Sequence, residues 1–326
     1  MIQGSFQSSL LTISRDLRST LCRTGIITLF AMLVALPTQA QTYVKGQYVE
    51  PAYEGWWEND DGTYSFIFGY HNENWEEELD IPVGDNNFFE PGDADRGQPT
   101  HFLPRRNRFT FEVRVPADWG DKELAWTLTS NGETRVAYAT LERDYVVDNV
   151  VIASETGSLG AGTSSPESRA NVAPTLIVQG DRVGGEIIRR VRVGEPLLIE
   201  ALVEDDGLPK PRATSSRIAG LDAKLRLLTP PSQVTVGKTN GLFLSWNVYR
   251  GDGQVAFDPP QIKPWEDTRT SANSPWGALW TPPELPSDGM YRTNVTFSEP
   301  GTYTLWGRAD DGGLYHDEYI TVIVSE

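Results

Sequence analysis

The 326-residue chain contains a single cysteine, Cys22, and only three histidines. Because Cys22 lies before the first apolar run, we expect a mature chain without cysteine, which excludes disulfide bonds and thiol catalysis. The sequence also lacks the motifs of zinc-binding helices, nucleophile elbows and phosphate-binding glycine loops. Stability must therefore come from burial of apolar side chains, and any catalytic group must be assembled by the fold.

Long apolar runs are also scarce, with one exception near the start of the chain. Three arginines, the last of them Arg23, precede an apolar run over residues 26–36 that ends in small residues. This order is typical of a signal peptide, and the run is too short to span a bilayer. We expect a signal peptide over residues 1–40, cleaved after Ala40. The mature chain is then expected to be secreted or periplasmic, with no membrane span.

Basic residues are few: 28 Lys and Arg stand against 45 Asp and Glu, which gives a net charge of −17. The expected signal peptide holds three Arg and one Asp, or +2, so the mature chain carries −17 − 2 = −19. Such a surface repels phosphate backbones, so we expect no nucleic-acid partner.

Helical periodicity is nearly absent, and short alternating apolar runs between turn residues predict an all-β fold. In the first half, turn motifs at Asn59–Gly62 and Asn131–Gly132 predict two hairpins. The pattern predicts a β-sandwich over residues 42–153. Its expected strands are 64–70, 75–83, 109–115, 124–129 and 135–141.

A second series of strands begins after residues 154–171, a small and polar stretch that predicts a flexible linker. The domain expected over residues 172–326 is interrupted by a Pro- and Trp-rich insertion at 258–288. Its expected strands are 173–178, 191–193, 196–203, 242–249, 255–257, 291–297, 302–308 and 315–324.

The second domain resembles bacterial immunoglobulin-like modules of the polycystic-kidney-disease (PKD) or cadherin-like kind. The resemblance rests on Ala173–Thr175, on Asp205–Gly207, on Ser245–Asn247 and on the ending Pro300–Leu305 with Ala309–Gly313. It implies two immunoglobulin-like β-sandwich domains after the signal peptide, and it marks a fold rather than an activity.

The first domain resembles secreted bacterial proteins that carry no assigned function. The matching residues are Glu54–Trp57, Phe68–Tyr70, Trp75–Leu79, Ile81–Gly84, Pro91–Asp93 and Arg96–Phe102. This resemblance implies export and a β fold.

Acidic residues next to glycine suggest calcium as the one cofactor to consider, although we expect none to be required. Asp93 and Asp95 alternate within the loop 92–97, which places two carboxylates on one side of it. Ca²⁺ prefers several such oxygen ligands. Asp and Gly are equally suited to turns, so the loop alone also explains them, and we favour that interpretation.

A basic cluster interrupts the acidic sequence at Arg96, His101, Arg105 and Arg106. Guanidinium groups bind carboxylates and sulfate in a fork, so the cluster is a candidate anion site. The alternative, which we favour, is that these side chains pair with nearby acids and attach a long loop to the sandwich.

The chain has ten tryptophans, three of which lie in the insertion: Trp265, Trp276 and Trp280. Exposed indole rings stack on sugars and contribute much of the energy of interfaces, which makes these three candidate ligand-binding residues. Alternatively they attach the insertion to the sandwich. We expect Trp57, Trp126, Trp246 and Trp306, which lie in strand patterns, to be core residues.

The sequence therefore favours a non-catalytic exported module that binds or supports an envelope protein or polysaccharide. One alternative is a glycan-binding protein that uses its exposed tryptophans. The other is a hydrolase with a site at the domain junction, because paired carboxylates would leave no motif in so acidic a chain.

Overall fold

The computed structural model describes residues 44–156, 166–210, 241–261 and 283–326. Residues Tyr43–Glu326 make one compact unit. Strands dominate the described residues, which confirms the all-β fold, and none of their helices is long and apolar enough to cross a membrane. Trp265, Trp276 and Trp280 lie outside the described residues.

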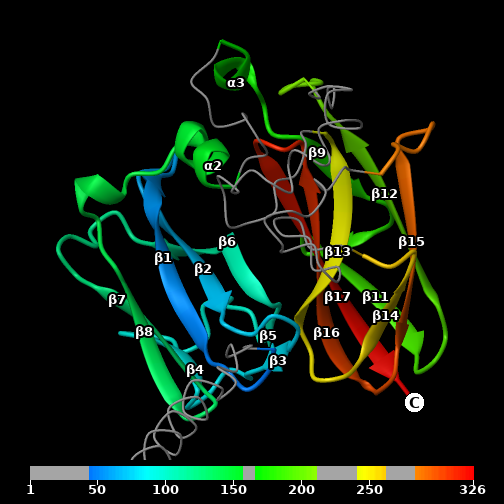
Figure 1. Cartoon of the computed structure of the whole chain (residues 1–326), viewed down its shortest axis with the longest axis horizontal. Helices are drawn as coiled ribbons and strands as arrows, with labels where there is room; N and C mark the ends of the chain where they lie inside the picture. Colours follow the sequence, from blue (N-terminus) through cyan, green and yellow to red (C-terminus); the bar gives the residue numbers. More distant parts are fainter. Residues whose placement is uncertain (1–43, 157–165, 211–240, 262–282) are drawn as a thin grey trace, which may run out of the picture. The chain divides into compact units, whose positions relative to one another are not determined.

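Two sheets form a first sandwich (Figure 1). Side chains from both sheets pack together in its core. One sheet has the order β1 (Val49–Glu58), β2 (Tyr64–Asn72), β6 (Arg105–Val115). The other has the order β4 (Asn87–Glu90), β7 (Leu124–Ser130), β8 (Glu133–Ala139), and β3 (Leu79–Asp80) pairs with β5 (His101–Phe102).

The two predicted hairpins of this sandwich are confirmed. Strands β1 and β2 pair up to Glu58 opposite Tyr64, and β7 and β8 pair up to Ser130 opposite Glu133. Asn131 (φ 49°) and Gly132 (φ 83°) both adopt positive φ, as a tight hairpin turn requires.

The strand predicted over residues 75–83 is wrong in extent, since only Leu79–Asp80 pairs there. The Asn72 side chain donates to the carbonyl oxygen of Glu77 at 2.8 Å, which holds the preceding residues in a loop. Strand β4 was not predicted, because Asn87–Glu90 offers only two apolar residues, side by side.

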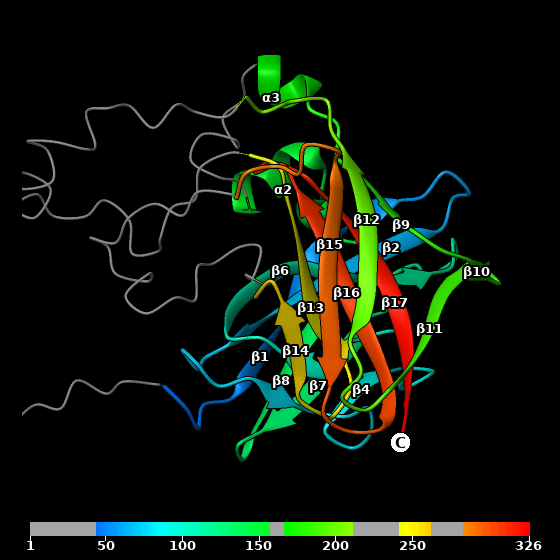
Figure 2. The ribbon, with the colours of Figure 1, turned by 90° about the vertical axis from the view of Figure 1, so that its right-hand side faces the viewer.

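A five-stranded and a four-stranded sheet form a second sandwich within the described residues (Figure 2). The larger has the order β10 (Arg182–Val183), β11 (Glu186–Arg192), β17 (Tyr315–Ser325), β16 (Gly301–Asp310), β13 (Phe243–Arg250). The smaller has the order β14 (Val255–Asp258), β15 (Met290–Phe297), β12 (Leu197–Glu204), β9 (Thr175–Val178). Strand β11 runs parallel to β17, whereas the other paired strands of these two sheets are antiparallel.

Short helices connect the sandwiches: η1 (Arg143–Tyr145), α2 (Asn149–Thr156) and α3 (Pro166–Ala170). Helix α3 and the last residues of α2 lie within residues 154–171, the segment expected to be a flexible linker, whereas η1 and the start of α2 precede it. Asp148 caps the N-terminus of α2, because its carboxylate accepts from the backbone N–H groups of Val150 and Val151, each at 2.9 Å.

The two sandwiches share buried contacts. Tyr249 and Trp306 of the second sandwich belong to the apolar cluster of the first. A separate buried cluster joins Ile67 and Phe109 to Ile152 of α2 and to Leu314, which precedes β17. These contacts create a junction between the β1-β2-β6 sheet and the β13-β16-β17 side of the larger sheet.

Candidate ligand pocket at the junction

Alternation along two strands brings polar and aromatic side chains to the junction. On β6, Phe111 and Val113 enter the core of the first sandwich, so Thr110 and Glu112 lie on the opposite face. On β17, Tyr315, Asp317 and Tyr319 share one face by the same rule, while Ile320 and Val322 enter the second core.

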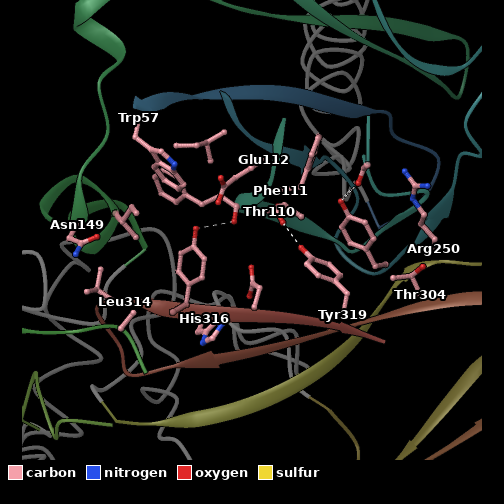
Figure 3. Close-up of a pocket in the computed structure, with 18 residues that line it drawn as sticks. Trp57, Thr110, Phe111, Glu112, Asn149, Arg250, Thr304, Leu314, His316 and Tyr319 are labelled. Carbon is pink, nitrogen blue, oxygen red and sulfur yellow. Dashed lines mark hydrogen bonds between the residues drawn. The ribbon is translucent and has the colours of Figure 1, made fainter. Parts of the chain in front are cut away.

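Tyrosine hydroxyl groups connect the two faces (Figure 3). Tyr315 donates to the carbonyl oxygen of Phe109 at 3.2 Å and Tyr319 to that of Thr110 at 3.3 Å. Tyr249 donates to the carbonyl oxygen of Gly97 at 2.5 Å. Burial is the largest cause that raises the pKa of each of these phenols, so the hydroxyl groups stay protonated donors.

An ion pair between the fully buried Arg308 and the largely buried Asp317 lies at the junction. Arg308 donates from Nε to Oδ1 of Asp317 at 2.6 Å and from Nη2 to Oδ2 at 2.5 Å. The same Nη2 reaches the carbonyl oxygen of Phe109 at 2.8 Å. The guanidinium carbon lies 3.6 Å from the ring centre of Tyr315 and 4.7 Å from that of Trp306. This pair therefore holds β6 against the second sandwich.

Between these contacts the junction forms a half-open cavity of about 750 Å³, which we call the junction pocket. Trp57, Thr110 and Glu112 project into it from the first sandwich, and Tyr319 projects into it from β17 (Figure 3). Further aromatic walls come from Phe109, Tyr249 and Tyr315. Its size and its mostly apolar walls are those of a small-molecule site.

Glu112 is the exposed carboxylate of this pocket. The pKa of Glu112 lies above its usual value, mainly because the surrounding protein removes water from the carboxyl group. The negative charge of Asp317 raises this pKa further, whereas a hydrogen bond from Ser65 opposes the rise. Burial also raises the pKa of Asp317, and the Arg308 guanidinium opposes that rise. The two carboxyl groups thus interact electrostatically across the junction.

The predicted basic cluster is bound by internal partners. Arg96 donates to the carbonyl oxygen of Pro91 at 2.8 Å, and Arg105 to that of Glu73 at 2.9 Å while it stacks on Trp75. Arg106 pairs with the buried Glu54 at 2.6 Å. Such contacts are of the kind expected if these side chains attach a long loop to the sandwich. Anion binding by the cluster stays a prediction.

His101 has the most polarised environment of that cluster. Its Nδ1 lies 2.7 Å from Oδ1 of Asp80, and its Nε2 lies 3.2 Å from Oε2 of Glu78. Burial lowers its pKa, but the two hydrogen bonds and charges outweigh burial and raise the pKa to about 9. The imidazolium therefore attaches β5 to β3.

The predicted calcium loop places its two acids differently. Both acids are exposed, and Asp95 accepts two hydrogen bonds from Arg250, at 2.8 and 3.1 Å. The Arg250 hydrogen bonds lower the pKa of Asp95. Within the described segments no group of three His, Cys, Asp or Glu could hold a metal ion, and calcium binding stays a prediction.

Three of the four tryptophans expected in the core are buried: Trp126, Trp246 and Trp306. Trp57 is instead half-buried and lines the junction pocket, because Ser65 and Ile67 beside it also face away from the first core. The sequence reasoning missed Glu112, Asp317 and Tyr319 as well. An available signal was the spacing of Tyr315, Asp317 and Tyr319, which places a carboxylate between two aromatic rings on one face.

No family model matches the chain, and no curated protein matches it. Among solved structures, one similar chain is a nucleoside hydrolase-related hypothetical protein from Saccharophagus degradans that is associated with carbohydrate metabolism. The identity is 13%, with 60% of this chain and 37% of that chain covered and a TM-score of 0.27. The chain therefore spans little more than a third of that protein.

Two other similar structures are a titin fragment and an S-layer protein. A chimeric titin fragment is 9% identical over 86% of this chain and 98% of that chain, with a TM-score of 0.22. An S-layer protein is 8% identical over 85% of this chain and 27% of that chain, with a TM-score of 0.22. At these values the similarities carry no statement about the activity of this chain.

Proposed function

We propose that the protein is a non-catalytic, exported binding module of the cell envelope whose ligand occupies the junction pocket. The observation that carries the proposal is the cavity of about 750 Å³ with aromatic walls between the two sandwiches. Pockets of this size and lining are typical ligand sites, and they occur preferentially where two folded layers meet.

The walls of this pocket are held in place before any ligand arrives. Buried Arg308 and the hydroxyl groups of Tyr315 and Tyr319 bind backbone carbonyl oxygens of β6. Fixed walls reduce the ordering cost of binding, so a modest number of contacts is enough to hold a ligand.

The test fills the pocket without removing a buried contact. Thr304 lines the pocket, so Thr304→Trp should obstruct it, whereas Thr302→Trp adds the same ring at an exposed position of the same strand. Wild type and both variants are screened by thermal shift against a panel of sugars, amines, amino acids and carboxylates. Ligands that stabilise wild type and Thr302→Trp, but not Thr304→Trp, support the proposal. Equal responses in all three proteins would place the site elsewhere.

A hydrolase with a site at the junction is the second candidate, favoured by the two carboxyl groups of Glu112 and Asp317 at one pocket. A carboxyl group with raised pKa is suited to act as a general acid. Both Asp317 oxygens are already bound by Arg308, which favours a structural role for this residue. Chromogenic glycosides provide the test: hydrolysis that is lost in Glu112→Gln with binding retained would favour the enzyme.

Glycan binding through Trp265, Trp276 and Trp280 is a separate prediction that concerns residues outside the described part. Its support is their composition and context in the sequence. A Trp276→Ala, Trp280→Ala double variant should lose the fluorescence response to polysaccharide that wild type shows. No response of wild type to a broad glycan panel would remove this candidate.

Export and calcium binding are tested apart from the pocket. Fractionation should recover a processed protein from the periplasm or medium, and recovery with its leader in the cytosol would contradict export. Calcium bound at Asp93 and Asp95 should raise the melting temperature in a way that EDTA reverses, by mass action on the folded state.

A further inference from the structure

The charges around the junction pocket cancel in pairs, with one exception. Asp317 is paired with Arg308, and Arg250 with Asp95. Nearby Glu54 is paired with Arg106. His316 lies on the opposite face of β17 from Asp317, and its Nδ1 accepts a hydrogen bond from the backbone N–H of Leu176 at 3.2 Å.

Glu112 is the exception among the described residues that line this pocket. It accepts a hydrogen bond from Ser65 and forms no ion pair with a described residue. The next basic side chain on its own face of β6, Arg114, is bound to Asp61 and to Thr63. One negative charge therefore remains open toward the cavity.

Aromatic rings surround this open carboxylate. Trp57 projects into the pocket from the same sheet as Glu112, and Tyr319 projects from the opposite strand (Figure 3). The negative faces of such rings attract ammonium groups, and a carboxylate beside them adds a direct charge partner. The chain's net charge of −17 also concentrates cations at its surface.

We infer that the junction pocket binds a small organic cation, with the ammonium group between Glu112 and the aromatic walls. The inference rests on the proposed function, since it names the ligand class of the same pocket.

The same charge balance weighs against two other ligand classes. An anion would meet the open carboxylate of Glu112 and would find Arg250 and Arg308 already bound to Asp95 and Asp317. A neutral sugar fits the aromatic walls but leaves Glu112 without a charge partner. A cation is the class that satisfies both the ring faces and the carboxylate.

The experiment compares choline with its uncharged tert-butyl analogue by isothermal titration calorimetry on the full protein. The two probes have nearly the same shape, so a difference in affinity reports the charge. We expect wild type to bind choline at least about tenfold more tightly, as expected when a charged partner faces a carboxylate.

Two variants locate the effect. Glu112→Gln keeps an acceptor for Ser65 and removes the charge, so it should reduce choline affinity about tenfold or more and leave the uncharged analogue unchanged. Glu123→Gln removes one negative charge from an exposed loop residue and should alter neither affinity by more than about twofold. Glucosamine and glucose repeat the comparison and distinguish an amino sugar from an alkylammonium ligand.

The outcomes separate this inference from the proposed function. Equal affinity for choline and its analogue, or equal choline binding by wild type and Glu112→Gln, would overturn the inference and leave a pocket for neutral ligands. Absence of binding by choline and glucosamine in wild type would overturn it as well. The proposed function fails separately, when Thr304→Trp binds every active ligand of its own panel as wild type does.

Discussion

The two sandwiches reach stability with different side chains. The core of the first contains large aromatic residues from both sheets, among them Phe66, Phe68, Phe89 and Trp126. The core of the second consists mainly of aliphatic residues such as Ile199, Leu305, Ile320 and Val322. Aromatic rings thus dominate the packing of the first core and branched aliphatic side chains that of the second, although each sandwich contains a strand of 11 residues.

The two sandwiches also differ in how they provide hydrogen-bond partners for buried backbone groups. Between β2 and β6 the first sandwich has long irregular segments, whose carbonyl groups lack partners in a sheet ladder. Fully buried asparagines bind them: Asn87 donates to the carbonyl oxygens of Ile81 and Pro99, each at 2.8 Å, and Asn72 binds Glu77 and Phe102. The first sandwich thus depends on amide hydrogen bonds where the second depends on strand pairing.

The largest expected effect concerns the aromatic core. Trp126 stacks on Phe89 at 5.8 Å and meets Phe111 edge-on at 5.0 Å. Trp126→Ala should lower the free energy of unfolding by about 4 kcal/mol, against about 3 kcal/mol for Leu305→Ala in the second core. Chemical denaturation monitored by circular dichroism measures both. A larger loss of stability for Leu305→Ala than for Trp126→Ala would contradict the idea that large aromatic side chains dominate the stability of the first core.

The next effect tests whether the two sandwiches unfold together. Arg308→Met leaves the largely buried Asp317 carboxylate without its partner and should cost about 3 kcal/mol. Adding Asp317→Leu should recover part of that loss, because the unpaired charge is gone. Calorimetry should show one transition for wild type, and two separate transitions in wild type would mean that the junction contributes little.

A smaller effect is expected at the asparagine network of the first sandwich. Asn87→Ala removes the partners of two carbonyl groups and of the Trp126 indole N–H, and should cost about 2 kcal/mol. Its exposed neighbour provides the control, since Asn86→Ala should change stability by less than about 0.5 kcal/mol. Equal denaturation midpoints for the two variants would show that the network adds no stability.

A pH-dependent effect is expected at His101, which belongs to the first sandwich. Its pKa rises from an ordinary 6.5 to about 9 in the folded protein, so protonation favours folding. The contribution is fully present below pH 6.5 and is lost as pH rises through about 9. His101→Gln should flatten the thermal stability profile across that window. A wild-type profile that is already flat would contradict the paired imidazolium.

The smallest effect is expected at exposed ion pairs of the second sandwich. Arg292 contacts Glu200 at 3.1 Å and Asp288 at 2.9 Å, and all three side chains are exposed. Arg292→Gln should change the unfolding free energy by no more than about 0.5 kcal/mol, because solvent screens such pairs. A stability loss as large as that of Arg308→Met would show that burial does not explain why the Arg308–Asp317 pair contributes more than an exposed pair.

Strand positions were largely predictable, and the pocket was not. Alternation located β2, β7, β12 and β13, since one face of each strand is apolar. The Asn131–Gly132 turn was readable because few residues accept positive φ. Glu112 gave no signal, because an acidic residue on the outer face of a strand is ordinary until another sheet covers that face.

The sequence by itself determined an all-β chain with a single cysteine and a strongly acidic composition, since local alternation and composition carry that information. Tertiary structure alone decided that the outer faces of β6 and β17 meet, that Arg308 is buried with Asp317, and that Trp57 lines a cavity. Those facts depend on which side chains from distant strands become neighbours, and period-two patterns specify only the face on which a side chain lies.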